Sequence, residues 1–353
     1  GCTRGCRFCH AGMVNRPIRE RTAGEVLSAL KTGLDQTGYE EVSLLSLSSS
    51  DHSDILALID GLKALLTERQ VNITLPSLRI ESFSEELMDV LQSLSPGGGF
   101  TLAPEAGTER LREIINKPLS DEELMDTVRS VFQHGWKSLK LYFMIGHPGE
   151  SLADVAAIAD LCKAVLGEGR RIAGGRVRVH AGVSTFIPKP HTPFQWAGFD
   201  DLAAIESKLG LLKEALRGTK IKMTWNDPQA SLLEAWLSRG DRRLAEVILQ
   251  AWRNGARFDA WGDQFSIQPW QDAFKTCGID PDFYSFRARD LDEILPWDHI
   301  NAGVRKAFLA EDYRLSQAGE SRPDCRARCY ACGILAAFNE LRQAQPGGGW
   351  QCP

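Results

Sequence analysis

The chain has 353 residues and a net charge of −5, and 43% of its residues are hydrophobic and 25% charged. These proportions are typical of a globular protein with one large domain or two ordinary ones. The acidic balance argues against avid, nonspecific binding to a nucleic-acid backbone. No apolar run approaches the roughly 20 residues that span a bilayer, so no membrane partner is expected.

The first nine residues contain three cysteines, Cys2, Cys6 and Cys9, in the spacing C-x3-C-x2-C. Three thiolates on one short loop can bind three corners of an iron–sulfur cube and leave the fourth iron open to another molecule. The same spacing also fits a zinc site or half of the ligands of an ordinary ferredoxin cluster. Because the chain opens directly on this loop, without a methionine or a preceding strand, we expect its natural N-terminus to lie upstream.

From residue 22 to about 195, helical segments alternate with short apolar strands. The expected helices lie near Ala23–Thr37, Ser53–Glu68, Ser84–Ser93, Ser120–His134 and Leu152–Leu166. The expected strands are Glu41–Leu47, Val71–Leu78, Phe100–Ala103, Ser138–Ile145 and Arg176–Ile187. This alternation predicts βα units and a parallel sheet.

The last two of these strands each have one apolar and one more polar face. We expect the apolar faces to pack on helices and the polar faces to line a substrate cavity. Lys140 and Tyr142 lie on one polar face, and Arg178 and His180 on the other. Tyr142 and His180 are therefore candidate catalytic residues on the substrate side. The alternative is that Lys140 and Arg178 lie at strand starts and are merely solvated.

After about Gly198 the composition changes. Eight of the nine tryptophans lie from Trp196 onward, and the βα alternation is expected to stop. We therefore predict a core at residues 1–200 and a helical, loop-rich extension at residues 201–353.

Active sites on parallel sheets form at the carboxyl ends of the strands, and four predicted strand ends carry unusual segments. These are S-L-S-S-S-D (46–51), A-P-E-A-G-T-E-R-L-R (103–112), I-G-H-P-G-E (145–150) and F-I-P-K-P-H-T-P-F-Q-W (186–196). The carboxylate of Glu105 can accept two hydrogen bonds from a ribose diol, although a surface role is the alternative. Gly146 and Gly149 permit close backbone approach to a ligand, or simply a turn into a helix. The serines of the first segment would serve equally well as a helix cap.

Taken in order with the cysteine loop and Phe8 before its last cysteine, these motifs resemble the radical S-adenosylmethionine (SAM) superfamily over roughly residues 1–196. The likeness is strongest to uncharacterised cobalamin-binding members related to methylthiotransferases. It implies an α/β fold, a partial (β/α)6 TIM-like barrel whose first strand is absent from this chain. It also implies a 4Fe–4S cluster on Cys2, Cys6 and Cys9 that chelates SAM and cleaves it reductively.

The resemblance also assigns cofactor-binding positions. Glu105 would hold the SAM ribose, and the 46–51 segment would contact the SAM amino group. The complete set of candidate cofactor-binding residues is Ser46, Ser48, Arg79, Ser82, Glu105, Gly146, Pro148, Gly149 and Ser184. Arg79 and Ser82 would hold the SAM carboxylate, although a cap or salt-bridge role would explain them too.

The implied function is a cytoplasmic transferase that methylthiolates or methylates an unknown substrate, RNA or protein. A flavodoxin- or ferredoxin-type reductant would be its partner, and cobalamin would enter only through the absent upstream region. Two alternatives stay open: a zinc-stabilised interaction module without catalysis, and an iron–sulfur electron-transfer protein.

A second C-x3-C-x2-C motif lies near the C-terminus. It comprises Cys325, Cys329 and Cys332, and Cys352 follows as a candidate fourth ligand. Four thiolates predict a closed site, either structural zinc or an auxiliary iron–sulfur cluster, whereas three would leave an open iron. Clustered cysteines without a secretion signal favour metal binding in a reducing cytosol over disulfides. The remaining two, Cys162 and Cys277, are expected to be ordinary thiols.

Overall fold

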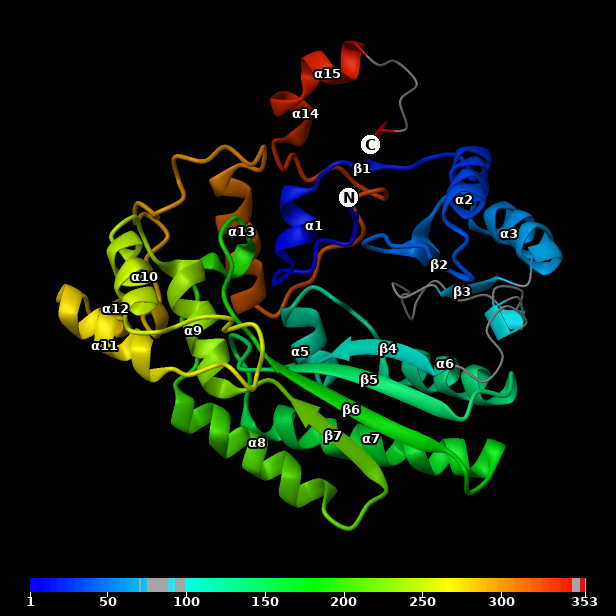
Figure 1. Cartoon of the computed structure of the whole chain (residues 1–353), viewed down its shortest axis with the longest axis horizontal. Coiled ribbons are helices and arrows are strands. Elements are labelled where there is room, and N and C mark those ends of the chain that lie inside the picture. Colours follow the sequence, from blue (N-terminus) through cyan, green and yellow to red (C-terminus); the bar gives the residue numbers. More distant parts are fainter. Residues whose placement is uncertain (70, 75–87, 90, 93–98, 345–349, 353) are drawn as a thin grey trace.

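The computed structural model describes residues 1–69, 71–74, 88–89, 91–92, 99–344 and 350–352. Its strands are β1 (Ile18–Arg19), β2 (Glu41–Ser43), β3 (Asn72–Thr74), β4 (Phe100–Glu105), β5 (Ser138–Ile145), β6 (Arg178–Thr185), β7 (Ile221–Trp225) and β8 (Trp350–Gln351). Within the described residues they form a parallel sheet in the order β4-β5-β6-β7, a parallel pair β2-β3 and an antiparallel pair β1-β8 (Figure 1).

The helices precede, connect and follow these strands. They are α1 (His10–Val14), α2 (Ala23–Thr37), α3 (Ile55–Arg69), α5 (Glu109–Ile114), α6 (Asp121–Gln133), α7 (Leu152–Ala173), α8 (Leu202–Leu216), α9 (Pro228–Arg239), α10 (Leu244–Arg253), α11 (Gln268–Cys277), α12 (Asp282–Ser285), α13 (Lys306–Gln317), α14 (Ile334–Ala337) and α15 (Asn339–Ala344). The predicted α/β class with a parallel sheet is confirmed. None of the helices in the described ranges is both long and apolar enough to cross a bilayer.

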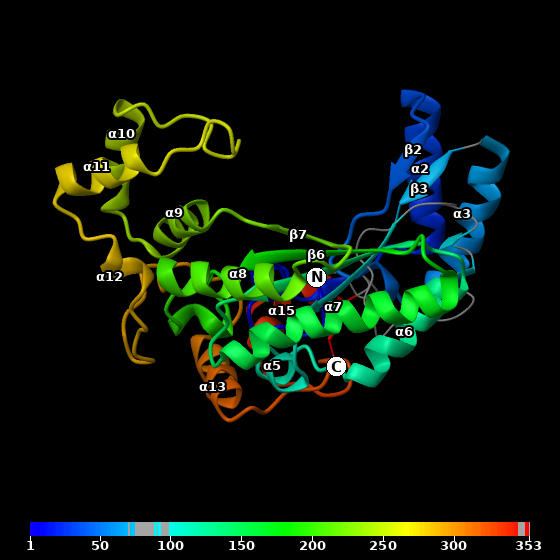
Figure 2. The same ribbon diagram turned by 90° about the horizontal axis from the view of Figure 1, so that it is seen from below.

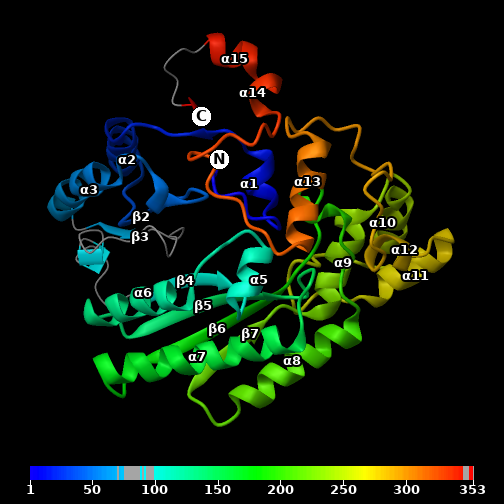
Figure 3. The same ribbon diagram turned by 180° about the vertical axis from the view of Figure 1, so that it is seen from behind.

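The apolar faces of β5 and β6 form the centre of the main core, as predicted. Leu141 and Phe143 of β5 and Ala181 of β6 are fully buried in one cluster with residues of the neighbouring helices. Figure 2 shows α6, α7 and α8 lying across this side of the sheet. The loop that carries the first three cysteines and α1 lie on the other side (Figures 1 and 3).

The sheet continues beyond the point where βα alternation was expected to stop, so that expectation is wrong. α8 follows β6, and β7 then pairs in parallel with β6 from Val179↔Ile221 to Val183↔Trp225. Two local features mark this continuation of the alternation. The side chain of Asp201 caps the N-terminus of α8, and a short strand follows that helix. The sheet therefore crosses residue 200, the predicted boundary between core and extension.

The strand predicted at Glu41–Leu47 ends early, at Ser43. Serine side chains after it bond locally: Ser46 Oγ lies 2.9 Å from Ser49 Oγ, and Ser48 Oγ donates to Asp51 Oδ2 at 2.6 Å. Such local bonds compete with a strand ladder. Half of the predicted strand 71–78 (residues 75–78) and most of the predicted helix 84–93 (all but residues 88–89 and 91–92) lie outside the described residues.

Asp154, in the first turn of α7, joins this helix to the turn after β4. It completes a capping box with Ser151 and accepts hydrogen bonds from Thr108 and Arg110. Burial opposes ionisation, but the bonds from Ser151, Thr108 and Arg110 outweigh it and lower the pKa of Asp154 to about 2. Because this pKa is depressed in the folded state, the stabilisation is present above the ordinary value near 3.8 and is lost as the pH falls towards 2.

We expect Asp154→Asn to lower the free energy of unfolding by roughly 2 kcal/mol at pH 7, since one pKa unit corresponds to about 1.4 kcal/mol. The difference from the parent should shrink between pH 4 and pH 2, as measured by urea unfolding across this range. Asp160→Asn, at an exposed position of the same helix, is the matched control and should change little. A deficit that is independent of pH would show that the carboxylate charge is not the cause.

Candidate active site

The three N-terminal cysteines lie on one loop that leads into α1. Cys9 is the N-cap of α1, and its Sγ accepts the backbone N–H of Gly12 at 3.3 Å. Burial, then the charge of Cys6, raises the pKa of Cys9 to about 11, and the charges of Cys2 and Glu105 add to this effect. The fold thus brings the three thiols and Glu105 close enough to interact electrostatically.

The donor set of this loop fits an iron–sulfur cluster. In the described part of the chain, no three Cys, His, Asp or Glu side chains converge on the position of a single metal ion. A cube does not require this, because each thiolate binds a different iron. A metal centre stabilises neighbouring thiols as thiolates, because its positive charge offsets their negative charges. Cys2, Cys6 and Cys9 would therefore hold the cluster.

Arg7, between the second and third cysteines, anchors the loop to the rest of the protein. Its side chain is fully buried. It donates to Ile114 O at 2.7 Å and Glu320 O at 2.6 Å, and lies 3.2 Å from Asp312 Oδ1. Burial lowers the pKa of Arg7, and the charge of Asp312 opposes this. One side chain thus attaches the cysteine loop to α5 and to the region of α13.

The side chain of Asn116 binds the backbone of the cysteine loop. Its Nδ2 donates to Gly5 O at 3.0 Å, and its Oδ1 accepts the backbone N–H of Arg322 at 2.6 Å. Both Asn116 and Gly5 adopt positive φ, 54° and 76°. The side chain therefore connects the N-terminal loop to the segment that carries the second cysteine motif. Sequence reasoning missed both Arg7 and Asn116, because nothing local marks a bond to residues more than 100 positions away.

Glu105 ends β4 in a left-handed conformation, with φ 69°, beside an irregularity in the β4–β5 pairing. Its Oε1 lies 2.9 Å from Nζ of Lys117, which is buried. The carboxylate is thus oriented by a partner that the sequence did not indicate. One of its oxygens is held by Lys117, and the predicted bond to a ribose would use the acceptor positions that remain.

In the I-G-H-P-G-E turn at the end of β5, Gly146 and Gly149 adopt positive φ. Glu150 Oε1 accepts the N–H of Gly146 at 2.8 Å and pairs with Lys208 Nζ at 2.6 Å. Burial raises the pKa of Glu150, and the charge of Lys208 opposes this. Lys208, on α8, is a second partner that the sequence did not reveal.

His147 in this turn contacts the cysteine loop directly. Its ring lies 5.9 Å from that of Phe8 and 5.1 Å from that of Phe186, centroid to centroid. Burial, then the charge of Lys208, lowers the pKa of His147 to about 3. Both ring nitrogens lack a hydrogen-bond partner among the described residues. The neutral imidazole of His147 thus lies between Phe8 of the cysteine motif and Phe186, which follows β6.

The segment after β2 also meets the cysteine loop. Arg4 Nε donates to Asp51 Oδ2 at 3.1 Å. Ser46 and Ser48 line a cavity of about 670 Å³ that Gly1 also borders. The predicted cofactor residues Arg79 and Ser82 lie outside the described residues.

Tyr142 and His180 lie on the polar face of the main sheet, as predicted. Lys140 donates to Tyr142 Oη at 2.5 Å, and His180 Nε2 lies 2.8 Å from Thr224 Oγ1. Burial and then the charge of Lys140 lower the pKa of His180. Ser184, further along β6, donates to Phe143 O at 3.3 Å. Their catalytic and cofactor-binding roles stay predictions.

The structure thus defines an α/β protein with three cysteines grouped on a loop at the carboxyl ends of parallel strands. Residues 1–162 match the family model of the radical SAM superfamily. The prediction from the motifs is confirmed.

The chain is similar to two curated relatives. It is 30% identical over 248 residues to the uncharacterized protein MJ0966 of Methanocaldococcus jannaschii. This alignment covers 70% of this chain and 52% of the relative. It is 24% identical over 170 residues to the ribosomal protein uS12 methylthiotransferase RimO of Desulfotalea psychrophila. This alignment covers 46% of this chain and 38% of the relative. The chain thus spans about half the length of the first relative and less of the second.

Two solved structures show weaker likeness. The coproporphyrinogen III oxidase HemN of Escherichia coli aligns with a TM-score of 0.42 and 15% identity over 61% of this chain and 49% of the other. OxsB, a cobalamin-dependent SAM radical enzyme, aligns with a TM-score of 0.39 and 10% identity over 98% and 58%. At these TM-scores the likenesses carry no argument about the function of this chain.

Proposed function

We propose that this protein is a radical SAM enzyme that cleaves SAM reductively and methylthiolates or methylates a macromolecular substrate. The observation that carries the proposal is the group of three thiols, pinned by Arg7 and Asn116 and interacting with Glu105. A 4Fe–4S cluster bound there would supply the electron for SAM cleavage.

The residues of the chain bind and orient around that chemistry. Cys2, Cys6 and Cys9 hold the cluster, and Glu105 accepts hydrogen bonds from the SAM ribose. The Gly146–Gly149 turn lines the adenine, where its backbone can approach closely. Tyr142 and His180 contact the substrate from the polar face of the sheet.

The preference for methylthiolation or methylation is supported by the similarity to a ribosomal protein methylthiotransferase. RNA or protein is therefore the proposed substrate class. A flavodoxin- or ferredoxin-type reductant, a cytoplasmic location and cobalamin bound by an upstream region belong to the proposal as predictions.

The test is anaerobic reconstitution with iron and sulfide, reduction with dithionite, and quantification of 5′-deoxyadenosine by mass spectrometry after addition of SAM. We expect iron and labile sulfide at the N-terminal triplet and 5′-deoxyadenosine as product. Bound cluster without SAM binding or cleavage would favour the electron-transfer alternative. Zinc at the N-terminal triplet in place of iron would favour the interaction module.

Glu105→Ala should weaken SAM binding roughly ten- to hundredfold, because a charge-assisted hydrogen bond contributes about 1.5–3 kcal/mol. Isothermal titration of the reconstituted protein with SAM measures the change. Glu113→Ala, at an exposed position on nearby α5, is the control and should bind like the parent. Affinity within twofold of the parent, with iron content retained, would remove Glu105 from the SAM site.

A further inference from the structure

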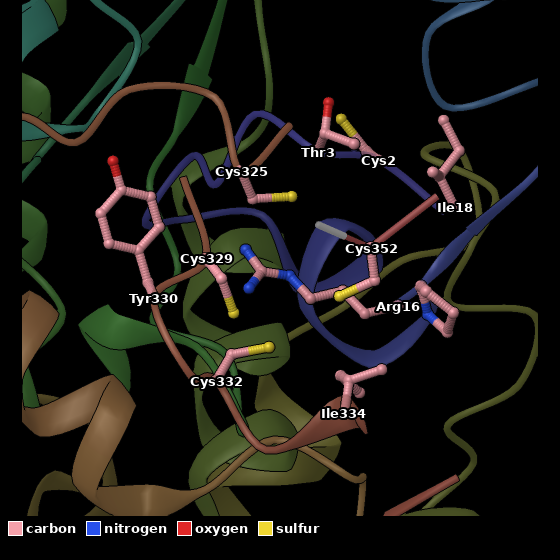
Figure 4. Close-up of a pocket in the computed structure, with 11 residues that line it drawn as sticks. Cys2, Thr3, Arg16, Ile18, Cys325, Cys329, Tyr330, Cys332, Ile334 and Cys352 are labelled. Carbon is pink, nitrogen blue, oxygen red and sulfur yellow. The ribbon is translucent and has the colours of Figure 1, made fainter. Parts of the chain in front are cut away.

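Four cysteines near the C-terminus and Cys2 of the N-terminal loop line one small cavity. Cys325, Cys329, Cys332 and Cys352 border a space of about 30 Å³, together with Arg16. Figure 4 shows their sulfur atoms arranged around the guanidinium of Arg16. The first three come from the segment before α14, and the fourth follows β8.

Two separate attachments bring these segments together. β8 pairs with β1 in the register Ile18↔Gln351, which places Cys352 beside the end of the N-terminal region. The segment of Cys325 is bound to the cysteine loop, because the Cys325 N–H donates to Thr3 O at 3.1 Å. Thr3 Oγ1 also donates to Asp324 Oδ2 at 2.7 Å. Neither attachment depends on the sulfur atoms, yet both bring thiols to the same place.

A cationic group already lies among the four sulfurs. Arg16 Nε donates to Gly12 O at 3.1 Å, and its guanidinium lies 5.4 Å from the Phe308 ring. The guanidinium lies between the sulfurs, and within the described residues no ligand set has converged on a metal position. Cys329 is exposed, so its side chain can turn inward once a smaller cation is bound.

We propose that Cys325, Cys329, Cys332 and Cys352 bind a zinc ion in a closed four-thiolate site, with the Arg16 side chain moving aside. Four cysteine ligands are the donor set of a structural zinc centre. With the Arg16 side chain in place, the remaining space of about 30 Å³ has room for one ion. On binding, the thiols release their protons and the Zn²⁺ takes four sulfur ligands, without a redox step.

The nearby arginine favours this charge balance. Four thiolates and one Zn²⁺ leave a net charge of −2, and the positively charged Arg16 borders the same cavity. The ion would fasten the last residues of the chain to the segment that holds Thr3, and thereby to the N-terminal cysteine loop. The proposed zinc ligands differ from those of the N-terminal cluster, although Cys2 borders the same cavity, and the zinc centre would exist even if the proposed function were wrong.

The test measures metal content in the full chain purified with zinc in the medium. The parent and a Cys2/Cys6/Cys9→Ala variant should both retain about one zinc per chain, measured by inductively coupled plasma mass spectrometry. Cys329→Ser combined with Cys352→Ser should lose that equivalent, whereas Cys277→Ser should keep it. Because Cys329 is exposed, its replacement leaves the core intact.

Cobalt(II) provides a second readout that does not depend on activity. Titration of the Cys2/Cys6/Cys9→Ala variant should yield intense sulfur-to-cobalt charge-transfer absorption, and the additional Cys329→Ser and Cys352→Ser changes should abolish it. Unchanged zinc content in the Cys329/Cys352 variant would overturn the proposal. Iron with labile sulfide at the C-terminal cysteines, or a disulfide among them, would overturn it equally.

Discussion

Replacing Cys2, Cys6 and Cys9 together by alanine is expected to abolish the reductive cleavage of SAM. The three thiols lie on one loop at the strand ends, and their removal leaves the loop with no sulfur ligand for an iron cluster. Iron content should fall by one cluster, and 5′-deoxyadenosine should drop to the level without protein. Mass spectrometry of the product and an iron and sulfide assay measure both effects.

The matched control is Cys277→Ser, at the end of α11 and away from both cysteine motifs. It should keep the cluster and the cleavage rate of the parent. Undiminished 5′-deoxyadenosine formation in the triple variant would contradict the assignment of the site. A folded variant, shown by an unchanged circular dichroism spectrum, is required for either conclusion.

Arg7→Leu should lower the free energy of unfolding by about 3 kcal/mol, because removing one member of a buried pair leaves polar groups without partners. The carbonyl oxygens of Ile114 and Glu320 each lose a donor. Asp312 keeps a second partner, since Arg322 Nε lies 3.3 Å from its Oδ1, so the lower end of the usual range of about 3–5 kcal/mol applies. Urea unfolding measures the loss, and the unfolding free energy of the two proteins should fall with urea concentration at the same slope.

Arg217→Leu removes the arginine of an exposed pair with Glu214, and it should change stability by less than about 1 kcal/mol. Equal effects of the two substitutions would show that Arg7 is not an anchor of the loop. Because Arg7 lies between Cys6 and Cys9, its loss should also reduce the iron retained after reconstitution, which the Arg217 variant should not do.

The amino-acid sequence by itself determined the features that depend on spacing and periodicity. The C-x3-C-x2-C motif and the turn at Gly146–Gly149 are local, and so they were predictable. The alternation of β5 and β6 was enough to predict which face of the sheet is buried, because successive side chains of a strand point to opposite faces.

Only the tertiary structure decided which distant groups meet. Lys117 holds Glu105, Lys208 holds Glu150, and Asn116 joins the cysteine loop to the C-terminal segment. The gathering of Cys352 with the second triplet depends on the pairing of β8 with β1, and the extension of the sheet by β7 depends on packing after residue 200. Such contacts form between residues far apart in the chain, where burial and long-range hydrogen bonds, rather than any local pattern, select the partner.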